Sequence, residues 1–87
     1  MQIQQKYQMQ KYQPQLALQI PDFRQALEYY VRRLRWHGWI SAYYDTREKF
    51  NGELAIEASR YCYEMGITYR LDDGRMMLSE GYVRMLP

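Results

Sequence analysis

The stretch that decides the fold is DFRQALEYYVRRLRWHG, which spans residues 22–38. Its apolar residues recur at spacings of four, three and four: Phe23, Leu27, Tyr30 and Leu34. This period predicts an amphipathic helix with one buried face. We expect Asp22 to be the N-cap, with Gln25 at the capping-box spacing. The helix then runs to about Trp36 and ends with Gly38 as its C′ residue.

A second helical pattern follows over 46–65. Its apolar positions are again three or four residues apart: Phe50, Leu54, Ala58, Tyr61 and Met65. We favour one helix over this range, ended by Gly66. Because Asn51-Gly52 is a pair that favours turns, the alternative is a helix with Asn51 as its N-cap, preceded by a loop over 45–50.

The other segments indicate strands. In 15–20, Leu and Ile alternate with Gln and Ala, and Pro21 closes the segment, so we expect a short strand there. An Asp-Gly pair between two alternating runs predicts a hairpin over 67–79. A last short strand is expected over 82–86. The segment 39–44, WISAYY, fits either a short strand or an aromatic connector.

These elements predict an α+β fold with two helices packed on a small antiparallel sheet, in the order β-α-α-β-β with one further C-terminal strand. We expect a single domain over 15–87, because 87 residues leave room for one core. Residues 1–14 are rich in Gln, Lys and Tyr, which predicts a flexible arm; the alternative is an arm that becomes ordered on a partner. A winged helix would suit the hairpin, but its core needs three helices and the sequence indicates two.

The inventory of reactive side chains argues against catalysis. The chain has one His and one Cys: His37 lies at a predicted helix end, and Cys62 lies within a predicted helix. The sequence contains neither a phosphate-binding glycine loop nor a nucleophile elbow, and two isolated residues do not form a metal site. We therefore expect a protein that is not an enzyme, with no catalytic residues, no metal and no cofactor.

The cellular location is predicted from cysteine usage and hydropathy. A single cysteine cannot form an internal disulfide, which favours a reducing compartment. No apolar run reaches the roughly 18 residues of a membrane span, and the N-terminus lacks the apolar run of a secretory signal. We expect a cytoplasmic protein that has no membrane partner.

Charge is divided between the two predicted helices. The whole chain carries a net charge of +2. Segment 22–44 holds four Arg against two acidic residues, whereas 45–66 holds three basic residues against five acidic ones. A basic helix beside an acidic one is the pattern of two packed neighbours. Pairing within the molecule is therefore the simplest explanation of the Arg residues near the end of the first helix.

Aromatic residues exceed what so small a core can enclose. Ten Tyr and two Trp occur in the chain, and Arg, Tyr, Trp and Met are the types enriched at protein interfaces. We expect a protein-binding module that acts as an adaptor, inhibitor or regulator of another macromolecule, or that forms a homodimer. A short chain with few motifs suits a regulator encoded by a virus or mobile element. The predicted binding residues are Arg24, Arg32, Arg35, Trp36 and Trp39.

The alternative function is nucleic-acid binding through the same Arg- and Trp-rich helix. Arg contacts phosphates, and exposed Trp stacks on unpaired bases. Against this alternative stand the small net charge, the acidic second helix and the few Lys residues. A small ligand remains a third class, because an aromatic-lined pocket leaves no sequence signature.

Overall fold

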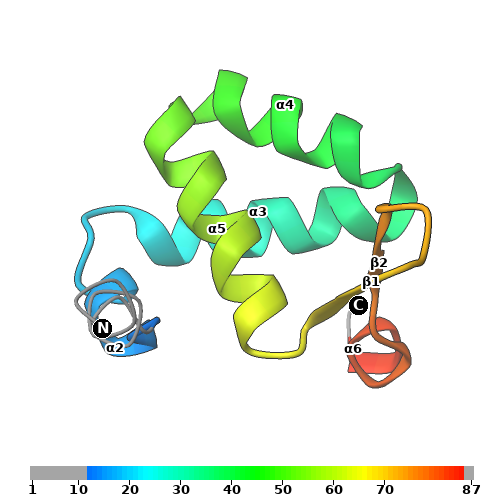
Figure 1. Ribbon diagram of the computed structural model, residues 1–87. Helices are drawn as coiled ribbons and strands as arrows, with labels where there is room; N and C mark the ends of the chain where they lie inside the picture. Colours follow the sequence, from blue (N-terminus) through cyan, green and yellow to red (C-terminus); the bar gives the residue numbers. More distant parts are fainter. Residues whose placement is uncertain (1–11, 86–87) are drawn as a thin grey trace, which may run out of the picture.

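The computed structural model describes residues 12–85, with side chains over 12–82 (Figure 1). Its helices are α2 (Pro14–Ala17), α3 (Phe23–Trp36), α4 (Trp39–Lys49), α5 (Gly52–Glu64) and α6 (Glu80–Met85). The strands β1 (Thr68–Arg70) and β2 (Met76–Leu78) form a two-stranded antiparallel sheet. The α+β class expected from the sequence is confirmed.

Three helices form the body of the molecule. Each of α3, α4 and α5 contacts the other two, with α4 alongside α3 and α5 crossing them (Figure 1). The hairpin lies at one end of this group, where β2 contacts α3 and β1 contacts α5. At the other end α2 packs against α5. The described part of the chain therefore shares one core, built mainly between helices.

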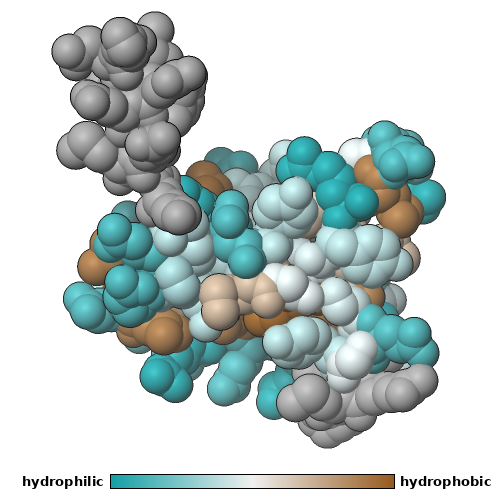
Figure 2. Space-filling model, turned by 60° about the horizontal axis from the view of Figure 1, so that its bottom comes forward, coloured by the Kyte–Doolittle hydropathy of each residue, from teal (hydrophilic) through white to brown (hydrophobic). Residues whose placement is uncertain are grey.

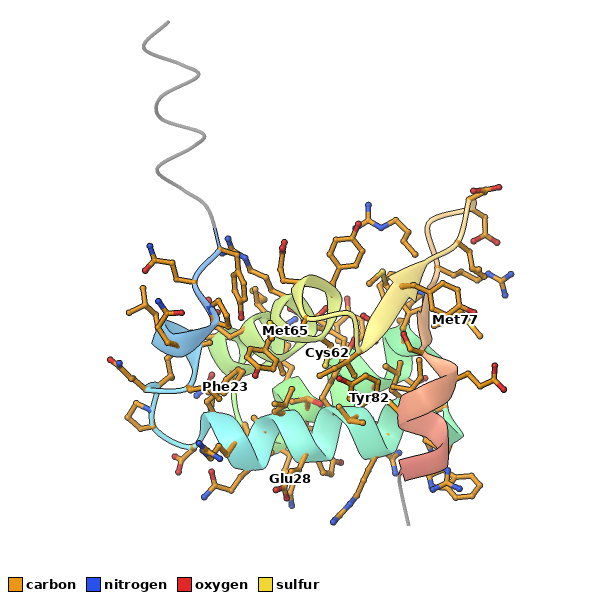
Figure 3. The ribbon with its side chains drawn as sticks, turned by 90° about the horizontal axis from the view of Figure 1, so that it is seen from below. Phe23, Glu28, Cys62, Met65, Met77 and Tyr82 are labelled. Carbon is orange, nitrogen blue, oxygen red and sulfur yellow. The ribbon has the colours of Figure 1, made fainter. Side chains whose placement is uncertain are left out.

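The core combines large side chains of α3 with mostly small side chains of α4 and α5. Phe23 and Tyr30 of α3 are fully buried, and Phe23 and Cys62 lie between α3 and α5 (Figure 3). The small buried residues of the other two helices are Ala42 and Thr46 on α4, and Ala55, Ala58 and Cys62 on α5. Leu54 is the one large side chain among the buried residues of α5. Small residues let the three helices approach closely.

Two buried hydroxyl groups in this core have partners. The Thr46 hydroxyl donates to the carbonyl of Ala42, one turn earlier in α4, at 2.7 Å. The Tyr30 hydroxyl is hydrogen-bonded to the side chain of Ser59 on α5, and burial nevertheless raises the pKa of Tyr30. Both bonds satisfy groups that would be costly to bury alone.

The segment 39–44 is helical and forms the first half of α4, so both the strand and the connector predicted for it are wrong. Its buried and half-buried residues continue at helical spacing into the region assigned to the next helix: Trp39, Ala42, Tyr43 and Thr46. Side chains three or four apart share one side of a helix. From the sequence, this side of α4 was expected to belong to two separate elements, 39–44 and 46–65.

The start of α5 follows the alternative interpretation rather than the favoured one. A single helix over 46–65 is wrong, because the chain breaks at Phe50 and Asn51. Asn51 is the N-cap, and its side-chain oxygen accepts a hydrogen bond from the amide of Leu54 at 2.8 Å. The loop that this alternative placed over 45–50 is instead mostly helical, because α4 continues to Lys49. The predicted end is confirmed, since Gly66 adopts a left-handed conformation with φ 77°.

The ends of α3 differ in detail from the predicted capping. Asp22 occupies the N-cap position, but it has φ 66° and its side chain makes no capping bond, so the capping box does not form. Gly38 is not a left-handed C′ residue: its φ is −67° and it precedes α4 as N-cap. Its carbonyl accepts the amide of Ala42 at 3.0 Å, which is the first bond of α4.

Two predicted strands are helical instead. In 15–20 the chain forms α2 and a turn, with Pro14 at the first helical position, where proline is well tolerated. The alternation there misleads, because Leu16 and Leu18 are exposed while Ala17 between them is buried. Of the strand expected over 82–86, the described part belongs to α6. Over residues 12–85 neither segment has a partner strand, since the sheet described there consists of β1 and β2.

The predicted hairpin is confirmed. Tyr69 pairs with Met77 at its centre, and Gly74 takes the left-handed conformation of the turn with φ 93°. Thr68 and Met76 are buried against the helices, whereas the central pair is exposed on the opposite face. Figure 3 shows Met77 on this hairpin.

The third helix changes one conclusion of the sequence analysis. A winged helix was set aside because only two helices were indicated, and α3, α4 and α5 followed by a hairpin now supply the missing one. Most of the predicted arm over 1–14 lies outside the described residues. Of its described part, Tyr12 packs edge-on against Tyr61 of α5, with ring centres 6.4 Å apart.

We predict that Asn51→Ala lowers the free energy of unfolding by about 1 kcal/mol, because it removes the capping acceptor of α5. Urea denaturation followed by circular dichroism measures this change. Asn51→Asp is the control and should retain most of the stability, since its carboxylate can accept the same bond. Equal stability of Asn51→Ala and the wild type would show that the cap contributes nothing.

Candidate binding groove

The apolar side of α4 is wider than the surface it buries. At about 100° per residue, Ala42 and Thr46 face the core, and Trp39 and Tyr43 lie beside them. Ile40 and Tyr44 extend the apolar arc further around the helix, and they are 55% and 56% exposed. The helix therefore keeps an apolar flank outside the core.

The next helix also divides into distinct sides. Its buried side is Leu54, Ala55, Ala58 and Cys62. Beside it runs a flank of Ile56, Ser59 and Tyr63, in which Ile56 is 55% and Tyr63 44% exposed. The outermost side carries three acidic residues and Arg60. An apolar flank on α5 thus adjoins the one on α4.

The two flanks enclose a groove, which we call the α4–α5 groove. One hollow of about 400 Å³ is lined by Trp39, Ile40, Tyr43, Tyr44 and Ser59. A second hollow of about 350 Å³ shares three of these residues and extends to the hairpin; its further lining residues are Ile56, Arg60, Tyr63, Arg70, Gly74 and Met76. Volumes of this order suit a side chain or a small ligand.

Four of the exposed large hydrophobic residues line this groove: Ile40, Tyr44, Ile56 and Tyr63. Single exposed apolar side chains are normal on protein surfaces, whereas a contiguous group indicates an interaction site. On the face drawn in Figure 2, hydrophobic residues stand in separate groups among hydrophilic ones. The groove instead brings two flanks of large apolar side chains to one hollow surface.

Two arginines line the second hollow, Arg70 from the hairpin and Arg60 from α5, and each guanidinium lies over a tyrosine ring. Arg60 also lines a hollow at the α2 end of the molecule. Arg70 lies 5.2 Å from the centre of the Tyr63 ring. Arg60 lies 4.9 Å from the centre of the Tyr12 ring. Within residues 12–82, neither arginine forms an ion pair. Stacking fixes the guanidinium plane and leaves its N–H donors at the edge for another acceptor.

The predicted binding residues do not form one cluster. Arg24 and Arg32 are exposed on the outer side of α3, the side from which Glu28 points away from α5 (Figure 3). Neither arginine makes an ion pair with the part of the chain that the structure describes. Arg24 precedes Trp36 by 12 residues, which is about 18 Å along a helix axis.

The remaining predicted residues lie at the corner between α3 and α4. Trp36 is 70% exposed, and the Arg35 guanidinium lies 4.9 Å from the centre of its ring. Trp39 is half-buried, packs against the core and lines both hollows of the groove. Of the five predicted residues, Trp39 alone lines the α4–α5 groove.

Internal pairing accounts for one arginine of the cluster near the end of α3. Arg33 donates from Nε and Nη2 to the same oxygen of Asp45, at 2.9 and 2.7 Å. This pair joins α3 to α4, and it links segment 22–44 to Asp45, the first acidic residue of segment 45–66, as the charge pattern indicated. Because both side chains are partly exposed, we expect it to contribute little stability.

Cys62 and His37, the two residues considered for catalysis, lie in different environments. Cys62 is fully buried, and burial raises the pKa of its thiol to about 12. His37 is exposed at the break between α3 and α4. Over the described residues, no group of three His, Cys, Asp or Glu side chains is placed to hold a metal ion. Likewise, none of the described helices has the length and apolar character needed to cross a membrane.

Several residues of the groove were missed by sequence reasoning, above all Ile40, Tyr44, Ile56 and Arg70. The signal that could have found the first two is the crowding of apolar residues in Trp39–Tyr44, which is more than one helix face can bury. No local signal points to Arg70, because the hairpin brings it to α5 from a separate element.

Comparisons of the chain with protein-family models, with curated proteins and with solved structures found no match in any of the three.

We predict that the Cys62 thiol of the folded protein does not react with Ellman's reagent at pH 8, and reacts fully after denaturation. Burial disfavours the thiolate, which is the reacting form. Rapid reaction without denaturant would show that the thiol is accessible.

The same pKa shift makes stability depend on alkaline pH. Above the ordinary value of 9.0 the unfolded chain loses the thiol proton while the folded one keeps it up to about 12. The free energy of unfolding should therefore fall across this window, by as much as about 1.4 kcal/mol per pH unit. The control Cys62→Ala should reduce this slope, and an unchanged slope would contradict the assignment.

Proposed function

We propose that this protein is a non-enzymatic binding module whose α4–α5 groove holds a segment of a partner protein. By occupying that surface of the partner, it would act as an adaptor or inhibitor. The observation that carries the proposal is the exposure of large apolar side chains on facing flanks of two helices. Tyr and Trp supply contact area at a small entropic cost and dominate interface energetics.

The chemistry of the groove supports a macromolecular partner over a substrate. Its lining offers aromatic surface with the phenol groups of three tyrosines, the hydroxyl group of Ser59, which already bonds Tyr30, and two arginines. Such a lining favours binding of apolar side chains. It supplies no pair of groups arranged as nucleophile and base.

Nucleic-acid binding is the second candidate, and one observation favours it. Three helices followed by a hairpin resemble the order of elements in winged-helix proteins, and α4 and α5 are joined by a two-residue break. In that comparison α5 would enter the groove of the nucleic acid. Its outer side, however, carries Glu53, Glu57 and Glu64 against Arg60 alone, and phosphates would repel such a helix.

We predict that the double substitution Ile40→Glu and Ile56→Glu removes binding of the natural partner in a pull-down from nuclease-treated lysate of the native host. The affinity should fall by about 30-fold or more, because the loss of even one apolar anchor at an interface costs roughly 2 kcal/mol or more. The thermal midpoint should change little, since both side chains are mostly exposed.

The control is Leu16→Glu, which introduces one of the two negative charges at a residue that is also 55% exposed but lies on α2. It should retain the partner. Equal loss by control and double variant would mean that added charge, not the groove, abolishes binding. Partners that disappear on nuclease treatment alone, or that the double variant still captures, would contradict the proposal and favour nucleic acid or another surface.

A further inference from the structure

We propose that the free edge of β2 is a second binding surface, on which an extended segment of a partner protein adds as a third strand of the sheet. This surface is distinct from the α4–α5 groove, so the inference goes beyond the proposed function. It is carried by the register of the hairpin together with a hollow that runs along β2.

The register of the hairpin determines which backbone groups of β2 are turned away from β1. The amide of Ser79 donates to the carbonyl of Ile67 at 2.8 Å, and Met77, two residues earlier, is therefore also a hydrogen-bonded position of the ladder. In an antiparallel pair these positions alternate with positions whose N–H and C=O groups point away from the partner strand. The backbone groups of Met76 and Leu78 therefore point outward from the sheet.

These outward groups are available to a further strand. Within residues 12–82, no backbone hydrogen bond joins Met76 or Leu78 to another element. Natural sheet edges are often protected by charged residues or proline, whereas β2 has the sequence Met-Met-Leu and carries neither. Donors and acceptors on alternate residues are the pattern that an added strand matches.

A hollow of about 250 Å³, which we call the β2 groove, lies along this edge. On one side it is lined by four consecutive residues, 75–78, and on the other by residues around the turn from α3 to α4, among them Leu34, Gly38 and Trp39. Figure 1 shows the hairpin beside this turn. Consecutive strand residues point to opposite faces of a sheet, so a hollow that all four residues line lies at the edge of β2 rather than over one face.

The walls of the β2 groove suit one short extended chain. Leu34 and the half-buried Trp39 offer apolar surface to alternate side chains of that chain. A Cβ atom added at Gly38 would meet no atom within 4 Å, so the groove is open at this point. Because β2 has three residues, the added strand can pair over about 10 Å.

Backbone hydrogen bonding, not charge, selects this occupant. The charged side chain in the lining of residues 75–78 is Arg75, and it is already paired with Asp73 at 2.8 Å. A second copy of the chain would have to bring its own β2 edge into the groove, but that edge has the turn from α3 to α4 beside it. Two recessed edges cannot pair along their length, whereas a single extended segment can enter.

The test begins by selecting binders of the whole protein from a random-peptide display library. Amide hydrogen exchange of the protein is then measured with and without the consensus peptide. We expect the amides of Met76 and Leu78 to exchange about tenfold or more slowly with the peptide bound, because each then donates to the peptide backbone. The amide of Met77 should change less, since it already donates to β1.

Gly38→Phe should lower the affinity of this peptide by about tenfold or more, because the ring occupies the β2 groove. Gly38 has φ −67° and ψ 164°, a conformation open to any residue, so the thermal midpoint should change little. Gly38→Ser is the matched control and should bind the peptide as the wild type does.

Other results would overturn the inference in distinguishable ways. Peptides lost on Ile56→Glu but unaffected by Gly38→Phe would belong to the α4–α5 groove and leave the β2 edge without a ligand. Slowed exchange at Arg70 rather than on β2 would place the added strand on the β1 edge. A selection that enriches no peptide would remove the third strand, while the pull-down would still test the α4–α5 groove. A dimer in sedimentation whose β2 amides are protected without peptide would assign the edge to a second copy of the chain.

Discussion

Tyr30 of α3 is buried at the centre of the molecule against helices that offer it mainly small side chains. The buried residues of α4 are Ala42 and Thr46, and those of α5 include two Ala and one Cys. Helices with small residues at their contact approach closely, and a close approach leaves little space for more large side chains. The limited space between these helices determines where the other large side chains of α4 and α5 lie.

Apart from Leu54, the large apolar residues of α4 and α5 lie partly or mostly outside this core. Ile40 and Tyr44 on one helix and Ile56 and Tyr63 on the other remain well exposed, although they lie close to the core in sequence. The turn at Phe50 and Asn51 folds α5 back toward α4, which turns two separate flanks into one groove. The α4–α5 groove thus follows from how the core is packed.

Features that depend on a few neighbouring residues could be predicted from the sequence. Residues close together in the sequence determine three such features: the helix over 22–36, the Asp-Gly hairpin and the helix end at Gly66. α4 could not be predicted, because its apolar residues spread over more than one face and hide the helical period. The prediction of a strand over 15–20 was wrong because the local sequence does not show whether a distant strand is available for pairing. For the same reason Trp39 could be selected from its residue type, whereas Arg70 could not.

The central claim is that the exposed residues of the groove are not needed for folding. The most direct measurement is the free energy of unfolding, in urea, of the triple variant Ile40→Ser, Tyr44→Ser and Ile56→Ser. The account predicts a value within about 1.5 kcal/mol of the wild type, because mostly exposed side chains contribute little each. A loss of several kcal/mol, or a broad transition, would show that these side chains belong to the core and would contradict the account.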